Sequence, residues 1–209
     1  MTQNKTLIII GAGMAGLSAG CYAQMNGYQT QIFELHNLPG GLCTAWKRKD
    51  YLFDGCIHYL FGSGEGQPFN QMWQELGAVQ GREFINHEVY QHVTDGEQTL
   101  IVYCDPDRLQ AHMTEISPDD AKLIQGFCDG VRQFASFDMS AMYKVPKTIM
   151  TSLDWAEYGR KMTPFVPALA RWATQSTRQF GNKFQNPFLQ EAVAQMFSWE
   201  EAPVMMGMM

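Results

Sequence analysis

One six-residue stretch near the start of the chain constrains its fold more than any other feature. Gly11-Ala12-Gly13-Met14-Ala15-Gly16 follows Leu7–Ile10, an apolar run typical of a strand buried on both faces, and leads into the small-residue segment Met14–Asn26. The first glycine permits a tight turn, the second lets an anion approach the backbone, and the third lets a helix pack closely on the strand. The pattern predicts a strand, a turn and a helix whose N-terminus holds a diphosphate, because free N–H groups and the helix dipole favour negative charge there.

A carboxylate follows at the position where a nucleotide ribose would lie. Gly27 is placed to end the helix, and the second predicted strand, Gln29–Glu34, closes on Glu34. A carboxylate at that point accepts hydrogen bonds from ribose hydroxyls and repels a 2′-phosphate. The nucleotide expected here is therefore FAD or NAD, and not NADP.

A second glycine pair, Gly40-Gly41, favours FAD, since a plain NAD-binding unit does not need another close backbone approach there. The glycine loop, Glu34 and Gly40-Gly41 together resemble the FAD-binding start of the amine oxidase and phytoene desaturase superfamily. Within it, Phe53-Asp54-Gly55-Cys56-Ile57-His58-Tyr59 is similar to the group of phytoene desaturases, carotenoid isomerases and retinol saturases. Many members have Arg after the glycine pair, where this chain has Leu42; backbone N–H groups, Lys47 or Arg48 are the alternatives for that contact.

The resemblance implies an α/β fold: an incomplete Rossmann-like FAD-binding βαβ unit with its hairpin over residues 1–65, then a partial, mostly helical substrate domain with one β-hairpin over 66–209. It implies flavin-mediated hydride or electron transfer on a hydrophobic polyene or isoprenoid-like substrate, causing desaturation, saturation or isomerisation. The residues expected to contact the cofactor are Gly11, Ala12, Gly13, Met14, Ala15, Gly16, Glu34, Leu35, Gly40, Gly41 and Leu42.

No catalytic acid–base pair stands out, as expected where a flavin performs the chemistry. His58 is the candidate for donating or relaying a proton, and a packed structural histidine is the alternative. Cys43 and Cys56 are interpreted as small apolar residues. Three other functions stay open: an amine-oxidase-like enzyme with a polar substrate, a non-catalytic dinucleotide-binding module, and a NAD-dependent dehydrogenase.

Composition limits the partners and the compartment. A net charge of −6 argues against nucleic acid as a partner. Residues 141–185 nevertheless carry seven basic side chains against Asp154 and Glu157, which indicates either a solvated helical face or a peripheral contact with an anionic membrane. The five cysteines include no C-x-x-C pair, so neither a metal site nor a redox dithiol is expected. Glycines interrupt the apolar start, which excludes a signal peptide and predicts a cytoplasmic protein.

The remainder of the chain reads as hairpins and then helices. Hairpins are expected over Ala45–Phe53 and through Glu88–Tyr103, the second turning at Asp95-Gly96. Helices are expected over Pro68–Leu76, from Pro106, and from a Ser117 cap to about Phe137, with further helices broken by prolines.

Two features of the later sequence bear on function. The aromatic and Met-rich residues fit either a long apolar substrate or ordinary core packing; they are Phe165, Trp172, Phe180, Phe184, Phe188, Met196, Phe197 and Trp199. Only two convincing parallel strands are present, whereas a doubly wound sheet needs several, so the chain is expected to be truncated after Met209 and prone to association.

Overall fold

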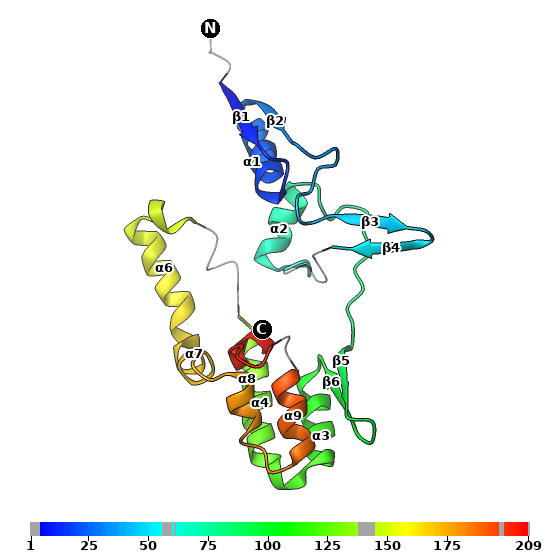
Figure 1. The fold of residues 1–209 in the computed structure, drawn as a ribbon. Helices are drawn as coiled ribbons and strands as arrows, with labels where there is room; N and C mark the ends of the chain where they lie inside the picture. Colours follow the sequence, from blue (N-terminus) through cyan, green and yellow to red (C-terminus); the bar gives the residue numbers. More distant parts are fainter. Residues whose placement is uncertain (1–4, 56–59, 61, 138–144, 197–198, 209) are drawn as a thin grey trace. The chain divides into compact units, whose positions relative to one another are not determined.

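The computed structural model describes residues 5–55, 60, 62–137, 145–196 and 199–208. Their contacts divide the chain into two compact units, Met1–Glu83 and Phe84–Met209 (Figure 1). Residues 66–83, expected in the second domain, lie in the first unit. There the Tyr22 hydroxyl of α1 (Met14–Met25) donates to Glu75 Oε2 of α2 (Pro68–Glu75) at 2.8 Å. A functional division at residue 65 stays a prediction.

The first unit begins with the expected strand, helix and strand. Strands β1 (Thr6–Ile10) and β2 (Gln29–Phe33) are parallel, with Thr6 opposite Gln29 and Ile10 opposite Phe33. Helix α1 packs on one face of this pair. It ends as predicted at Gly27, whose φ of +82° places it in the left-handed region and whose N–H donates to Gln24 O at 3.0 Å. The mixed α/β fold class is confirmed.

The expectation that the first strand is buried on both faces is wrong for this structure. Ile8 is 61% exposed and Ile10 82%, and Phe33 on β2 is 56% exposed. The described residues form only a two-stranded sheet here, and α1 covers one of its faces. Ile8, Ile10 and Phe33 therefore leave apolar side chains uncovered on the other face of this sheet.

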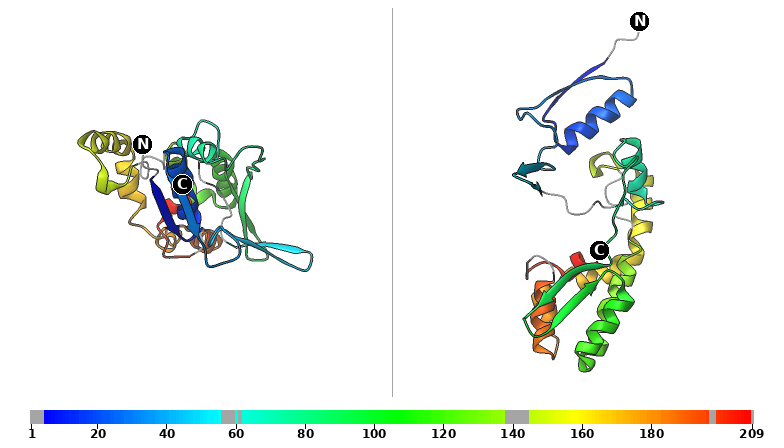
Figure 2. Two further views of the ribbon diagram at one scale, coloured as in Figure 1. Left: turned by 90° about the horizontal axis from the view of Figure 1, so that it is seen from above. Right: turned by 90° about the vertical axis from the view of Figure 1, so that its right-hand side faces the viewer.

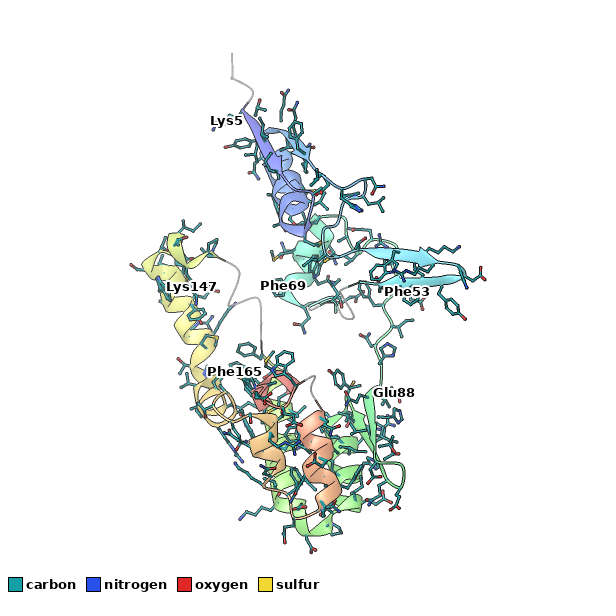
Figure 3. The ribbon with its side chains drawn as sticks, viewed as in Figure 1. Lys5, Phe53, Phe69, Glu88, Lys147 and Phe165 are labelled. Carbon is teal, nitrogen blue, oxygen red and sulfur yellow. The ribbon has the colours of Figure 1, made fainter. Side chains whose placement is uncertain are left out.

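The predicted first hairpin is confirmed. Strands β3 (Ala45–Arg48) and β4 (Tyr51–Asp54) are antiparallel, and the rings of Trp46 and Phe53 stack across the pair with centroids 6.2 Å apart. Phe53 is labelled in Figure 3. At the tip Lys49 adopts a φ of +54°, which a tight two-residue turn requires.

The second unit opens with the predicted hairpin, β5 (Val89–Thr94) and β6 (Thr99–Tyr103). Its connection is longer than a tight Asp95-Gly96 turn. Asp95 Oδ1 accepts from the N–H groups of Glu97 and Gln98 at 2.9 and 2.8 Å, which closes a four-residue loop. A side-chain acceptor thus replaces the compact backbone turn.

Helices form the remainder of the second unit, and Figure 2 gives two further views of them. They are α3 (Pro106–Ile116), α4 (Ala121–Phe134), α6 (Ser152–Met162), α7 (Val166–Trp172), α8 (Thr177–Gly181) and α9 (Pro187–Gln195), with 3-10 turns at Pro118–Asp120, Lys147–Ile149, Thr163–Phe165 and Val204–Gly207. The segment expected to cap the next helix, Ser117–Asp120, precedes α4, which begins at Ala121 with Asp120 as its N-cap, but no side chain of the segment accepts a capping hydrogen bond, and a 3-10 turn intervenes after Ser117. The Ser117 hydroxyl instead donates to Asp120 Oδ2 at 2.7 Å.

The principal hydrophobic core lies in this second unit, where α3 packs on α4 and β6 and where α8 packs on α9. Five of the aromatic and methionine residues singled out in the sequence are buried in it: Trp172, Phe180, Phe184, Phe188 and Met196. Phe165 is half-buried, and its ring meets that of Phe137 edge-on at 4.8 Å. Trp199 is 54% exposed. Core packing therefore accounts for most of this set, and Phe197 lies outside the described residues.

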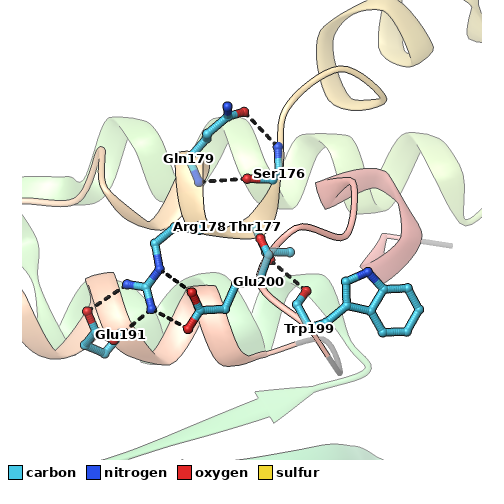
Figure 4. A network of polar contacts seen from close by, with 7 residues as sticks. All are labelled: Ser176, Thr177, Arg178, Gln179, Glu191, Trp199 and Glu200. Carbon is cyan, nitrogen blue, oxygen red and sulfur yellow. Dashed lines mark hydrogen bonds and ion pairs between the residues drawn. The ribbon is translucent and has the colours of Figure 1, made fainter.

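Part of the positive charge of residues 141–185 is neutralised locally. Arg178 makes bidentate ion pairs with Glu191 and Glu200, with closest N···O distances of 2.8 and 2.7 Å (Figure 4). Lys161 pairs with Glu157 at 3.5 Å. Membrane contact through this segment stays a prediction. No helix within the described ranges combines the length and the apolar character needed to cross a membrane.

Candidate functional site

The loop between β1 and α1 leaves the start of the helix open. Gly11 has a φ of +98°, and its N–H donates to Phe33 O at 2.7 Å, which ties the turn to the end of β2. Gly13 is the N-cap of α1; it has no side chain to accept a hydrogen bond, and the first turn carries no acidic residue. In contrast, Asp105 caps α3 and Asn186 caps α9 with side-chain oxygens. The first-turn amides of α1 are thus suited to an external anion.

The three glycines of the loop have separable roles. A Cβ on Gly16 would lie 2.0 Å from the Gly11 carbonyl oxygen, so close packing requires glycine there. Gly11 needs its left-handed backbone conformation. Gly13 has an ordinary φ of −74°. If Gly13 carried a Cβ, the nearest atom to it would be Gly41 Cα, at 4.0 Å. Neither the backbone nor the packing of the described residues requires glycine at position 13, and the space beside it is open to a ligand.

Glu34 lies at the opening of α1. One carboxylate oxygen, Oε2, accepts from Ala12 N–H at 2.7 Å, and the other, Oε1, accepts from His36 N–H at 2.8 Å. These two backbone bonds, that from His36 first, hold the pKa of the Glu34 carboxyl below its ordinary value. A carboxylate can accept about four hydrogen bonds, so two sites remain for hydroxyl donors.

The second glycine pair lies against the loop. Gly40 N–H donates to Ala12 O at 2.8 Å, and Gly13 and Gly40 form an isolated parallel bridge. A Cβ on Gly41 would lie 3.1 Å from Gly13 Cα. Both glycines have positive φ, +122° and +60°. Ala12 is therefore bonded on both sides, through its N–H to Glu34 and through its carbonyl to Gly40.

The structure thus brings the glycine loop, Glu34 and the glycine pair together, although their binding role stays a prediction. Ala12 is buried at 5% exposure, and Met14 is 42% exposed. Leu35 is fully exposed and Leu42 is 84% exposed. His58 and Cys56 lie outside the described residues. His36 was not singled out from the sequence; its place two residues after Glu34 is the only signal that pointed to it.

Of the other charged and sulfur-containing residues, Cys43 contacts this arrangement, because its N–H donates to Gly40 O at 3.1 Å. Lys47 and Arg48 are exposed on the β3–β4 hairpin. Cys43 is half-buried, and burial of Cys128 in the second unit raises its pKa to about 12, which leaves that thiol protonated. Within the described ranges no group of three or more His, Cys, Asp or Glu side chains is placed to hold a metal.

Comparison with known proteins agrees with this geometry. Residues 9–76 match the family model of the NAD(P)-binding Rossmann-like domain. A lycopene-forming phytoene desaturase of Paracoccus sp. is 22% identical over 193 residues, which are 90% of this chain and 36% of that protein. An inactive all-trans-retinol 13,14-reductase of Danio rerio is 27% identical over 60% of this chain and 21% of its own length. A chloroplastic prolycopene isomerase of Daucus carota is 31% identical over 34% of this chain and 12% of its own length.

The chain spans about a third or less of the length of these relatives. The matched segment 9–76 contains the glycine loop, Glu34 and the glycine pair. The chain thus carries a Rossmann-like dinucleotide-binding domain at residues 9–76 and is a relative of the carotenoid desaturases, prolycopene isomerase and retinol reductase.

Proposed function

We propose that this chain is the FAD-binding portion of a flavin-dependent oxidoreductase that acts on a hydrophobic, polyene-like substrate. The main support for this proposal is the N-terminus of α1, which has no side-chain cap and lies beside the Glu34 carboxylate, 2.7 Å from Ala12 N. Amides of the first turn would hold the diphosphate, and the two remaining acceptor sites of Glu34 would hold the ribose hydroxyls. The negative charge of Glu34 disfavours a 2′-phosphate.

The glycine pair supports FAD over NAD. Gly40 and Gly41 lie beside Gly13, and as glycines they carry no Cβ that would cover their backbone. An extended ligand leaving the diphosphate finds a second stretch of accessible backbone there. Leu42 has no charge with which to bind the flavin phosphate. We therefore propose that backbone N–H groups near Gly40-Gly41 bind it. When bound, the flavin would accept or donate a hydride or electrons.

The proposed substrate class follows from the relatives, whose names specify phytoene, prolycopene and retinol. All are long apolar polyenes or are converted to them, and an enzyme for such molecules must exclude water from the reacting carbons. The second unit would contribute to the substrate domain. His58 remains the candidate for moving a proton near the flavin.

Binding of FAD by the chain tests the cofactor assignment. The chain is titrated with FAD or NAD, and binding is followed calorimetrically. We expect weak binding of FAD and no binding by the Gly13→Val variant, because the added side chain occupies the diphosphate space. Binding of NAD but not FAD would indicate a NAD-dependent dehydrogenase instead, and undiminished binding by Gly13→Val would remove the loop from the site.

A non-catalytic dinucleotide-binding protein is a second candidate, favoured by one observation: the matched retinol reductase of Danio rerio is named inactive. Anaerobic mixing of the FAD-loaded full-length protein with phytoene or retinol separates the two. Bleaching of the flavin absorbance by the polyene supports the enzyme; a stable flavin spectrum with tight FAD binding supports the binding protein.

A further inference from the structure

Residues 34–40 form a small loop, and both of its ends are hydrogen-bonded to the same residue, Ala12. At its start, Glu34 Oε2 accepts from Ala12 N–H at 2.7 Å; at its end, Gly40 N–H donates to Ala12 O at 2.8 Å. The two groups proposed to hold the dinucleotide, the Glu34 carboxylate and the glycine pair, therefore keep their positions only while the intervening residues keep their shape.

Little packing supports these intervening residues. Leu35, His36, Asn37 and Leu38 are all exposed. The backbone groups of residues 35–39 make no backbone-to-backbone hydrogen bond with any described residue. The shape of the segment must then come from side-chain hydrogen bonds, as in the turns that Asn and Asp side chains close onto the backbone.

The imidazole of His36 provides such a bond. Leu38 N–H donates to His36 Nδ1 at 3.2 Å, a link between residues two positions apart. The backbone N–H of the same histidine donates to Glu34 Oε1 at 2.8 Å. One residue thus holds the carboxylate from one side and braces the turn from the other.

We propose that His36 is a positioning residue of the dinucleotide site, whose neutral imidazole holds residues 35–38 in the shape that presents Glu34 and Gly40 to Ala12. This inference rests on the proposed function. The same Nδ1 lies 3.4 Å from Leu38 O, so both backbone groups of Leu38 lie within reach of this ring.

Two substitutions isolate the hydrogen bond from His36 Nδ1. His36→Asn keeps an acceptor that reaches the N–H two residues on. His36→Leu removes the acceptor and keeps a side chain of similar bulk. Binding of ADP and of FAD to the full chain is measured calorimetrically at pH 8, with Gly13→Val as the non-binding control.

We expect His36→Leu to weaken ADP binding about two- to tenfold at pH 8, as loss of one hydrogen bond predicts. His36→Asn should bind as the unchanged protein does, because its side chain restores the acceptor. Equal affinity of the Leu variant and the unchanged protein, or an Asn variant that binds as weakly as the Leu variant, overturns the role of His36 alone. No ADP or FAD binding by the unchanged chain overturns the proposed function as well.

Discussion

Replacing Gly13 and Gly16 separately by Ala distinguishes a glycine needed for a ligand from one needed for the fold. At position 13 the backbone φ of −74° suits alanine, and the new Cβ meets only Gly41 Cα at 4.0 Å. Alanine gains about 0.4–1 kcal/mol because the unfolded chain has less freedom, and it loses a similar amount because it is a poorer N-cap than glycine. The stability of Gly13→Ala should therefore change by less than about 0.5 kcal/mol.

At position 16 the same methyl group would lie 2.0 Å from Gly11 O, with Ile9 Cγ2 at 3.2 Å. Relief requires α1 to move away from β1, which costs about 2–3 kcal/mol by analogy with overpacked cores. Amide hydrogen exchange across β1, α1 and β2 reports the stability of this region locally. Exchange should accelerate strongly in Gly16→Ala and hardly at all in Gly13→Ala.

Dinucleotide binding should nevertheless be impaired in Gly13→Ala, although the stability of this region hardly changes. A methyl group in the diphosphate space displaces at least one hydrogen bond to a charged group, worth about 1.5–3 kcal/mol, or about 10- to 150-fold in Kd. Calorimetric titration with FAD measures this change. The reasoning is refuted if Gly13→Ala binds FAD normally, or if its amides exchange as fast as those of Gly16→Ala.

Three further predictions follow from the described contacts. Glu34→Gln should weaken ADP binding at neutral pH, because a neutral amide offers fewer acceptor sites than a carboxylate. The unchanged carboxylate, whose pKa its backbone hydrogen bonds lower, should keep its contribution to binding in mild acid and lose it only as the pH falls below the ordinary range of a glutamate; calorimetric titrations over an acidic to neutral pH series check both. Ile8→Lys should reduce concentration-dependent association in sedimentation experiments more than Gln31→Lys, which adds equal charge to the same exposed sheet face but leaves its apolar area intact. Asp120→Ala should destabilise the second unit by about 2–4 kcal/mol in thermal melts, because Gln185 N–H and Asn186 N–H would lose the acceptor that Asp120, only 4% exposed, provides. An unchanged stability would show that water replaces the lost carboxylate.

Much of the local structure was readable from the sequence, because it depends on neighbouring residues. The turn at Gly11, the end of α1 at Gly27 and the tip of the first hairpin follow from backbone conformations that few residues adopt. The alternation of apolar and small residues was enough to predict β1, α1 and β2 within a residue or two. The dinucleotide-binding class was readable for the same reason: its motif is short and continuous.

Tertiary contacts decided how the parts of the motif meet. Only the approach of β2 and of residues 34–40 to the loop makes Ala12 bond to both Glu34 and Gly40. The separate roles of Gly13 and Gly16 were already expected from the sequence, and the packing of α1 on β1 agrees with them. The exposure of Ile8 and Ile10 was unreadable from their apolar sequence, since burial depends on how many strands and helices surround them. Sequence determines conformation over a few residues; which distant groups meet, and which faces stay uncovered, is determined by the whole fold.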